Sequence, residues 1–158
     1  MPAPQNQKND LVAKSLHFLK YRPRSREEIR KYLASKTNNS KIIHQVIKYL
    51  DELKLINDQE FAQWFVRGRL KQSKGPRLIS KELTYKFGVN PELVKQTLST
   101  IDNKQLLTSA QTALNKKLRQ LSKYPPFEAK QRVYRYLYQR GFTSNTITAA
   151  IDESNLGE

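Results

Sequence analysis

The stretch of the sequence whose residues could do chemistry lies between Phe65 and Leu83 and reads FVRGRLKQSKGPRLISKEL. Its single acid is Glu82, and its six cations are Arg67, Arg69, Lys71, Lys74, Arg77 and Lys81. Guanidinium and ammonium groups bind phosphate oxygens and carboxylates through charge-assisted hydrogen bonds. The stretch contains no histidine or cysteine that would supply a catalytic base or nucleophile. It therefore predicts a surface that binds an anionic partner.

Apolar residues recur through residues 61–70 at the spacing of a helix with about 3.6 residues per turn. On that helical wheel the core-facing arc consists of Phe61, Ala62, Phe65, Val66 and Leu70. The cationic stripe on the other side consists of Arg67, Lys71 and Lys74. Trp64 borders this stripe, where its ring would stack on a base, contact a partner protein or close the edge of the core. Arg69 falls inside the apolar arc, so we expect it to pair with a carboxylate or reach outward, and to serve the fold.

Two further basic groups lie outside this stretch. The first surrounds Pro23 in YRPRSRE, and the second lies in NKKLRQ; their cations are Arg22, Arg24, Arg26, Lys116, Lys117 and Arg119. If they align along one edge of an elongated molecule, they form a basic face that follows a filament or a phosphate backbone. The candidate binding residues are therefore Trp64 and all the cations named above except Arg69.

The whole chain is strongly basic. Its 158 residues include 29 Lys and Arg against 14 Asp and Glu, a formal net charge of +15. Nucleic acid is the usual partner of such a chain, although a basic surface that only maintains solubility is the alternative. There are no cysteines for disulfides or thiolate sites. No run approaches the roughly 18 apolar residues of a membrane span, and the start MPAPQNQKND lacks a signal-peptide core, so we expect a cytoplasmic protein.

The inventory of catalytic and metal-binding groups is poor. The only histidines are His17 and His44. The main acidic cluster, which could hold Mg²⁺, consists of Asp51, Glu52, Asp58 and Glu60. These acids fall where one helix ends and the next begins, and acids are ordinary there. We therefore expect no enzyme, no metal ion and no cofactor.

Helix signals repeat along the chain. Ser25 with Glu28 forms a capping box, and Asp58 is expected to cap the helix of the basic stretch. Three equivalent helices share one pattern at a period of about 50 residues. Their caps are Asn39, Asn90 and Thr143, and their apolar positions are Ile43/Ile47/Leu50, Val94/Leu98/Ile101 and Ile147/Ile151. Before each lies a helix with apolar residues four apart, Ile29/Leu33, Ile79/Leu83 and Val133/Leu137. Gly88 and Gly141 are expected to end the last two in left-handed turns.

The sequence therefore predicts an all-α fold, an elongated and curved array of three tandem three-helix repeats with about nine helices. The expected parts are a flexible N-terminus (1–9), repeat 1 (10–56), repeat 2 (57–101), repeat 3 (102–153) and a C-terminal tail (154–158). A three-helix unit of this size buries little apolar surface alone, so stacking of neighbours must supply the remaining stability.

At this point the chain resembles the RecX family of bacterial regulators of the RecA recombinase. The resemblance rests on RPRSREEIRKYL and on LDELKLINDQEFAQWFVRGRLKQSKGPRLISKEL, and it runs from about Leu11 to about Glu153. Two features depart from the family pattern. SKTNNSKII has no glycine where many relatives end their second helix, and LTYKFGV is one residue longer before its glycine than the equivalent segment of repeat 3.

The resemblance implies tandem three-helix repeats, which agrees with the period found above. It also implies a non-enzymatic negative modulator that binds the RecA–DNA filament and inhibits its ATPase, strand exchange and growth. The implied partners are the RecA filament and single- and double-stranded DNA, and we expect a monomer. Two alternatives stay open: an autonomous DNA-binding helical repeat without a recombinase partner, and a nuclease that uses the acids between residues 51 and 60.

Overall fold

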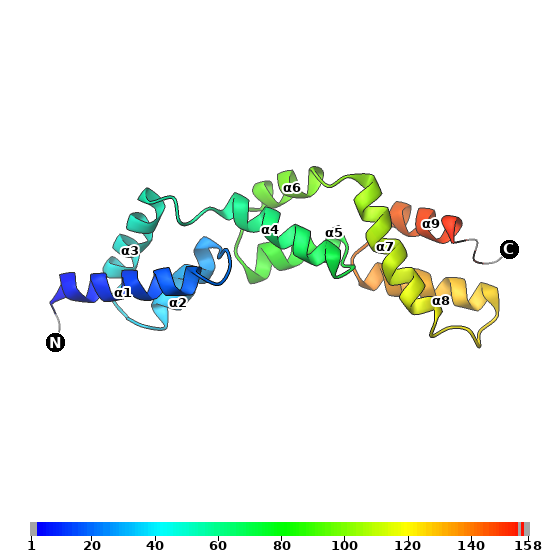
Figure 1. Cartoon of the computed structure of the whole chain (residues 1–158), viewed down its shortest axis with the longest axis horizontal. Coiled ribbons are helices and arrows are strands. Elements are labelled where there is room, and N and C mark those ends of the chain that lie inside the picture. Colours follow the sequence, from blue (N-terminus) through cyan, green and yellow to red (C-terminus); the bar gives the residue numbers. More distant parts are fainter. Residues whose placement is uncertain (1–2, 155, 157–158) are drawn as a thin grey trace.

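The computed structural model describes residues 3–154 and 156, and within them it contains nine α-helices, one π-helical turn and no strand. The elements are α1 (Pro4–Leu19), α2 (Arg26–Ala34), α3 (Ser40–Glu52), α4 (Asp58–Lys71), α5 (Pro76–Lys81), the π-helical turn η1 (Glu82–Lys86), α6 (Pro91–Ser99), α7 (Asn103–Leu118), α8 (Pro126–Gln139) and α9 (Ser144–Glu153). They form three consecutive groups along an elongated molecule (Figure 1). The predicted all-α array of three-helix repeats is confirmed.

Each repeat has a hydrophobic core of its own. The core of repeat 1 consists of Leu11, Ile29, Leu33, Ile42, Val46, Leu50 and Ile56. The core of repeat 2 consists of Phe61, Ala62, Phe65, Val66, Ile79, Leu83, Phe87, Val89 and Val94. The core of repeat 3 includes Leu114, Val133, Leu137, Phe142 and Ile147. Three small cores in a row explain how a chain of low hydrophobic content folds without one large core.

The predicted helix caps are confirmed with one exception. The capping box of Ser25 and Glu28 forms in both directions. Side-chain oxygens also cap the third helix of each repeat, from Asn39, Asn90 and Thr143. Asp58 does not cap α4, however, because Asn57 occupies that position and accepts from Gln59 and Glu60. The Asp58 carboxylate instead accepts the backbone N–H of Arg26 at 2.8 Å and so ties repeat 2 to repeat 1.

The buried face of α3 differs from the predicted one by a rotation of the helix. Ile43 and Ile47 were expected in the core, but they are only partly buried, and Ile42 and Val46 are buried instead. Leu50 belongs to both sets. Because α3 packs against both α1 and α2, its apolar surface is wide, and a single pair of apolar residues does not fix its rotation.

The N-terminal helix is longer than predicted. Residues 4–9, expected to be flexible, form the start of α1, with Pro4 at a first-turn position that favours a helix. The Gln7 side chain donates to the Thr37 hydroxyl at 3.1 Å, which holds this turn against the end of α2. Within α1, Leu16 is exposed, and Ser15 takes the buried position by donating its hydroxyl proton to the Leu11 carbonyl.

The predicted C-terminal tail (154–158) lies partly outside the described residues. Of the two that are described, Ser154 caps the end of α9, and Leu156 packs against the core of repeat 3.

The extra residue before Gly88 is absorbed by the π-helical turn. In repeat 3, α8 runs as an α-helix to its C-cap and Gly141, whereas in repeat 2 the turn η1 lies between α5 and Gly88. A π-turn accommodates one additional residue without breaking the helix. Gly88 and Gly141 have positive φ angles of 64° and 97°, which confirms the predicted left-handed helix ends.

Consecutive repeats meet by a shared geometry: the start of the second helix of one repeat contacts the glycine turn of the next. In the first joint, the Ser25 hydroxyl donates to the Phe87 carbonyl at 2.8 Å. In the second joint, the Gly75 N–H donates to the Arg140 carbonyl at 2.8 Å and the Arg77 N–H donates to the Gly141 carbonyl at 2.9 Å. These hydrogen bonds fix the repeats at the joints.

Candidate nucleic-acid interface

The basic stretch found in the sequence lies mostly on α4 and at its C-terminal end. The apolar arc is confirmed for Phe61, Ala62, Phe65 and Val66, which are buried. Arg67 and Lys71 are exposed on the opposite side, one helical turn apart. Trp64 is partly buried and packs against the core of repeat 2, and the Arg22 guanidinium lies 5.5 Å from its ring centre. This places Trp64 at the edge of the core, beside a cation.

Lys74 does not continue the helical stripe, because α4 ends at Lys71. Ser73 has a left-handed φ of 57°, its N–H donates to the Leu70 carbonyl, and the Lys74 N–H donates to the Arg69 carbonyl. This pair of bonds is a Schellman motif with serine at the position that glycine usually occupies. The helical wheel therefore holds for Arg67 and Lys71 only.

A basic groove runs between the C-terminal half of α4 and α7. It consists of two adjoining hollows of about 600 and 480 Å³, which share Lys71, Ser73 and Thr112. Its cations are Arg67, Lys71, Lys104, Lys116, Arg119 and Arg140, and its one acid is Asp102. The structure thus brings part of the basic stretch together with Lys116 and Arg119 from the distant NKKLRQ segment. We call this surface the basic groove.

The walls of the basic groove are fixed to each other. The Ser109 hydroxyl on α7 is buried and donates to the Leu70 carbonyl near the end of α4 at 2.8 Å. Where the groove meets the end of α8, the Arg140 guanidinium donates to the backbone carbonyls of Ser73 and Gln72. The remaining cations project from walls that are already positioned, so a phosphate ligand does not have to order the backbone.

Arg140 and Lys104 were missed by the sequence reasoning. Lys104 lies in the first turn of α7, and nothing in the sequence sets it apart from other exposed lysines. Arg140 directly precedes Gly141, so its side chain starts at a helix end that packs against repeat 2. An arginine beside a helix-ending glycine was the available signal, but its partners come from residues 72 and 73, far away in the sequence.

The arginines around Pro23 are engaged inside the protein and do not extend the basic groove. Arg22 forms two hydrogen bonds with the Glu28 carboxylate. Arg24 donates to the Phe18 carbonyl and lies 3.8 Å from the centre of the Phe18 ring. Burial, and then repulsion from Arg22, lower the pKa of Arg24 below its ordinary value, although the Glu28 carboxylate opposes this. The expectation that all basic groups line one edge is not met by this group, because each cation has a partner nearby.

Two of the acids that were considered as a metal site, Asp51 and Asp58, are hydrogen-bonded to Arg26. Its guanidinium donates to the Asp51 carboxylate, and this hydrogen bond raises the pKa of Arg26. The Arg26 backbone N–H binds Asp58, while burial raises the pKa of the Asp58 carboxyl. Among residues 3–154 and 156, no group of three or more potential ligands is placed to hold a metal ion. Of these acids, Asp58 joins repeat 2 to repeat 1, and Asp51 forms its ion pair within repeat 1.

The other candidate cations are dispersed. Arg77 donates to the Tyr138 carbonyl, and its guanidinium lies 4.0 Å from the Tyr138 ring centre, at the second joint. Lys81 is exposed on α5 and lines neither hollow of the basic groove. Lys117 lies 5.1 Å from the centre of the Tyr136 ring and lines a separate small hollow together with residues of α8. The basic groove is thus built from a subset of the predicted cations.

Arg69 pairs with a carboxylate, as its place in the apolar arc predicted. Its Nε and Nη2 donate to one oxygen of Glu82 at 3.1 and 2.8 Å, and its Nη1 donates to Gln72. Both members of the ion pair are mostly buried, with 21% and 16% of their side chains exposed. The pair joins α4 to the π-helical turn across the core of repeat 2.

Replacing Arg69 with alanine should lower the free energy of unfolding by about 2 kcal/mol, because Glu82 loses its partner while it stays mostly buried. Urea denaturation followed by circular dichroism measures this change. The double variant Arg69→Met with Glu82→Leu should regain most of the loss, because it removes both charges. An Arg69→Ala variant that unfolds like the wild type but no longer binds oligothymidylate would instead place Arg69 in the binding surface.

Within the described part of the chain, the structure has no helix whose length and apolar character would let it cross a bilayer.

Three models of one protein family match successive parts of the chain. The first three-helix domain of RecX matches residues 13–50, the second matches residues 57–98 and the third matches residues 104–151. These matches follow the three groups of helices in order.

The chain is also similar to proteins named regulatory protein RecX. That of Bacillus subtilis is 34% identical over 141 residues, which cover 89% of this chain and 53% of the relative. That of Oceanobacillus iheyensis is 33% identical over 145 residues, which cover 91% and 53%. The chain thus spans about half the length of these relatives. The crystal structure of RecX from Lactobacillus salivarius superposes with a TM-score of 0.86 at 25% identity, covering 96% of this chain and 99% of that one.

Proposed function

The chain belongs to the RecX family, and from this premise we propose that it is a negative modulator of the RecA recombinase. It binds the RecA–DNA filament and inhibits the filament's ATPase activity, strand exchange and growth. It acts by binding and carries out no reaction, so it needs no cofactor. It works as a monomer in the cytoplasm, where RecA and DNA are found together.

The observation that carries the proposal is the basic groove. Five of its six cations come from α4 and α7, whose relative position is fixed by the Ser109–Leu70 hydrogen bond, and Arg140 comes from the end of α8. Five of the six have exposed or solvent-facing side chains that are free of ion pairs with the described residues; they are Arg67, Lys71, Lys104, Lys116 and Arg119. Lys and Arg side chains at such spacing bind the phosphate backbone and release its condensed counterions. We therefore assign the DNA contact of the filament to this groove.

The elongated frame supports a filament as the partner. Three repeats in a row present an extended surface (Figure 1), and a filament offers a continuous partner of regular shape. Among the other candidates, Lys81 and Lys117 add to the positive electrostatic field that attracts DNA from a distance. Arg22 with Trp64, and Arg77 with Tyr138, make contacts across the joints between repeats instead. The side chains of Arg24 and Arg26 have their partners within repeat 1. Lys74 lies just beyond the end of α4, and we propose no DNA contact for it.

The deciding experiment measures RecA ATPase activity on single-stranded DNA while this protein is titrated in. We expect inhibition at well below one copy per RecA monomer, because a modulator that blocks growth or spans several subunits acts on many at once. The second candidate function, DNA binding without a recombinase partner, is favoured only by the basic groove itself. In that case inhibition would begin only when the added protein saturates free DNA.

Affinity of the protein alone for oligothymidylate should fall steeply as salt rises. Each phosphate contact releases condensed counterions, with a slope in a log–log plot of about −0.7 per contact on single strands. With about four contacts from the groove, affinity should fall about fiftyfold between 50 and 200 mM salt. Fluorescence anisotropy over a salt series measures the slope, and an affinity that stays constant over that series would contradict a phosphate-binding groove.

A further inference from the structure

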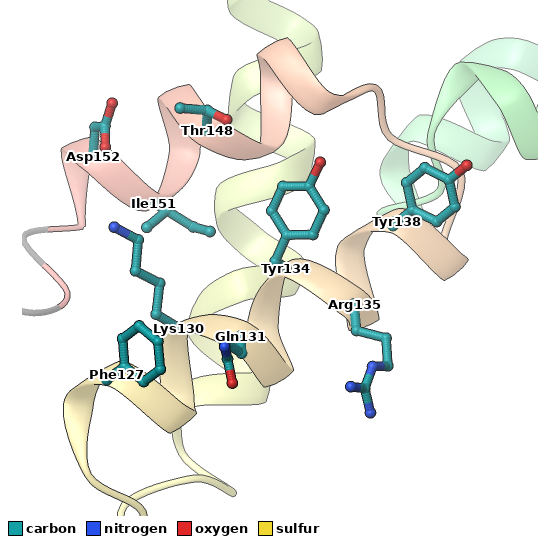
Figure 2. Close-up of a pocket in the computed structure, with 9 residues that line it drawn as sticks. All are labelled: Phe127, Lys130, Gln131, Tyr134, Arg135, Tyr138, Thr148, Ile151 and Asp152. Carbon is teal, nitrogen blue, oxygen red and sulfur yellow. The ribbon is translucent and has the colours of Figure 1, made fainter.

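A second surface of repeat 3 is chemically unlike the basic groove. It is a pocket of about 650 Å³ between α8 and α9, and it shares no residue with the groove. Figure 2 shows Phe127 and Lys130 from the start of α8 facing Ile151 of α9, with Tyr134 at the centre. Phe127 is 74% exposed and Tyr134 is 37% exposed. Large aromatic side chains that gather around an exposed hollow mark interaction sites.

The fold does not require an aromatic residue at position 127. The second helices of the three repeats have their N-caps at equivalent positions, which are Ser25, Gly75 and Pro125 in chain order. Two residues after each N-cap stand Glu27, Arg77 and Phe127, respectively. In repeats 1 and 2 that residue is charged and contacts the following repeat: Glu27 lies against Gly88, and Arg77 stacks on Tyr138. In repeat 3 the same position is apolar and exposed.

The occupant of this pocket is not a further three-helix unit of the same kind. Each joint depends on a donor at the N-cap of the second helix, namely the Ser25 hydroxyl in the first and the Gly75 N–H in the second. Pro125, at the equivalent place, has neither a hydroxyl nor an N–H. A unit from a second copy of this chain would therefore lack the hydrogen bond that both existing joints share.

The charges around the pocket indicate what the occupant carries. Of the three cations of α8, only Arg132 has a carboxylate partner among the described residues, which is Glu128. Lys130 lies at the rim of the pocket, so an occupant with carboxylates beside its apolar part is favoured. Asp152 of α9 lies on the opposite rim and repels any anion, so the carboxylates of the occupant are expected on the Lys130 side of its apolar part.

From this arrangement we propose that the pocket between α8 and α9 binds an apolar side chain on an acidic segment of RecA, the protein component of the filament. The inference rests on the proposed function and adds a protein contact to the DNA contact of the basic groove. The two surfaces share no residues, so the chain holds DNA and protein by separate parts.

The test replaces Phe127 with alanine and measures inhibition of RecA ATPase on oligothymidylate. The concentration for half-inhibition should rise by about tenfold or more, because an aromatic anchor in a pocket carries much of the binding energy. Lys130→Glu should also raise the concentration for half-inhibition, because it reverses the charge at the rim of the pocket. Phe127→Trp should keep inhibition within about threefold of the wild type, because it keeps an aromatic anchor. The matched control is Tyr85→Ala, which removes an aromatic side chain that is 80% exposed on repeat 2, and it should leave inhibition unchanged.

Two further measurements separate the alternatives. Phe127→Ala should bind oligothymidylate alone with the affinity of the wild type, and it should sediment like the wild type. Weaker binding to oligothymidylate would overturn the proposal in favour of base stacking, and a change of oligomeric state would overturn it in favour of a second copy. A wild-type protein that inhibits RecA, together with a Phe127→Ala variant that inhibits equally well, would overturn this inference alone. A wild-type protein without any effect on RecA would overturn the proposed function as well.

Discussion

The variant Lys71→Gln, Lys116→Gln, Arg119→Gln should bind oligothymidylate about one hundredfold more weakly than the wild type, since three phosphate contacts are lost together. The three side chains line one hollow of the basic groove from both walls. The salt dependence should also become shallower, by about two in the log–log slope. Fluorescence anisotropy measures both quantities, and filament inhibition should weaken in parallel. Folding should be nearly unaffected, because exposed substitutions usually shift stability by no more than about 0.5 kcal/mol each.

A matched control separates the groove from the overall charge. The variant Lys41→Gln, Lys48→Gln, Lys95→Gln removes the same charge from exposed positions outside the groove. It should weaken binding by about threefold at most, through the long-range field alone. If both triple variants lose affinity to the same extent, the net charge of +15 governs binding and the groove has no special role.

Replacing Gly141 with alanine should lower the free energy of unfolding by about 4 kcal/mol, the largest effect on stability that we expect of a single substitution. Gly141 has a φ of 97°, and an added Cβ would lie 2.5 Å from the backbone nitrogen of Leu78. The methyl group would therefore strain its own backbone and force the second joint apart, with loss of the Arg77–Gly141 hydrogen bond. Thermal unfolding should shift downward by about 10 °C.

Gly68→Ala is the control for this prediction. Gly68 lies within α4, and an added Cβ would meet nothing within 4 Å. Alanine should therefore stabilise the helix by up to about 1 kcal/mol. A Gly141→Ala variant as stable as the wild type would show that repeats 2 and 3 separate at little cost, and that the joint does not fix the walls of the groove.

The helices and their repetition were predictable because their signals are local. The capping box of Ser25 and Glu28 spans one turn of helix, and the caps at Asn39 and Asn90 act on the next two or three residues. Gly141 ends α8 by its own φ angle. Such interactions are set by near neighbours in the sequence, and the period of about 50 residues only repeats them.

The location of the binding surface was less predictable. Lys71 and Arg67 were identified as exposed cations, but the groove they share with α7 was not. Lys74 was placed on the same stripe because the left-handed turn at Ser73 has no glycine to signal it. The aromatic pocket around Phe127 was not predicted: Phe127, Tyr134 and Tyr138 lie on one face of α8, but the pocket needs α9 to complete it.

The sequence by itself determined that this protein is an all-α array of three repeats with a basic surface, because periodicity, caps and composition are properties of the chain. Only the tertiary structure decided which cations are available to a ligand. Arg22 and Arg26 are paired with Glu28 and Asp51, whereas Lys71 and Lys116 meet across a groove without a carboxylate partner among the described residues. The physical reason is that a charge is neutralised by whatever lies within a few ångströms in space, and packing of distant helices, not sequence order, brings those groups together.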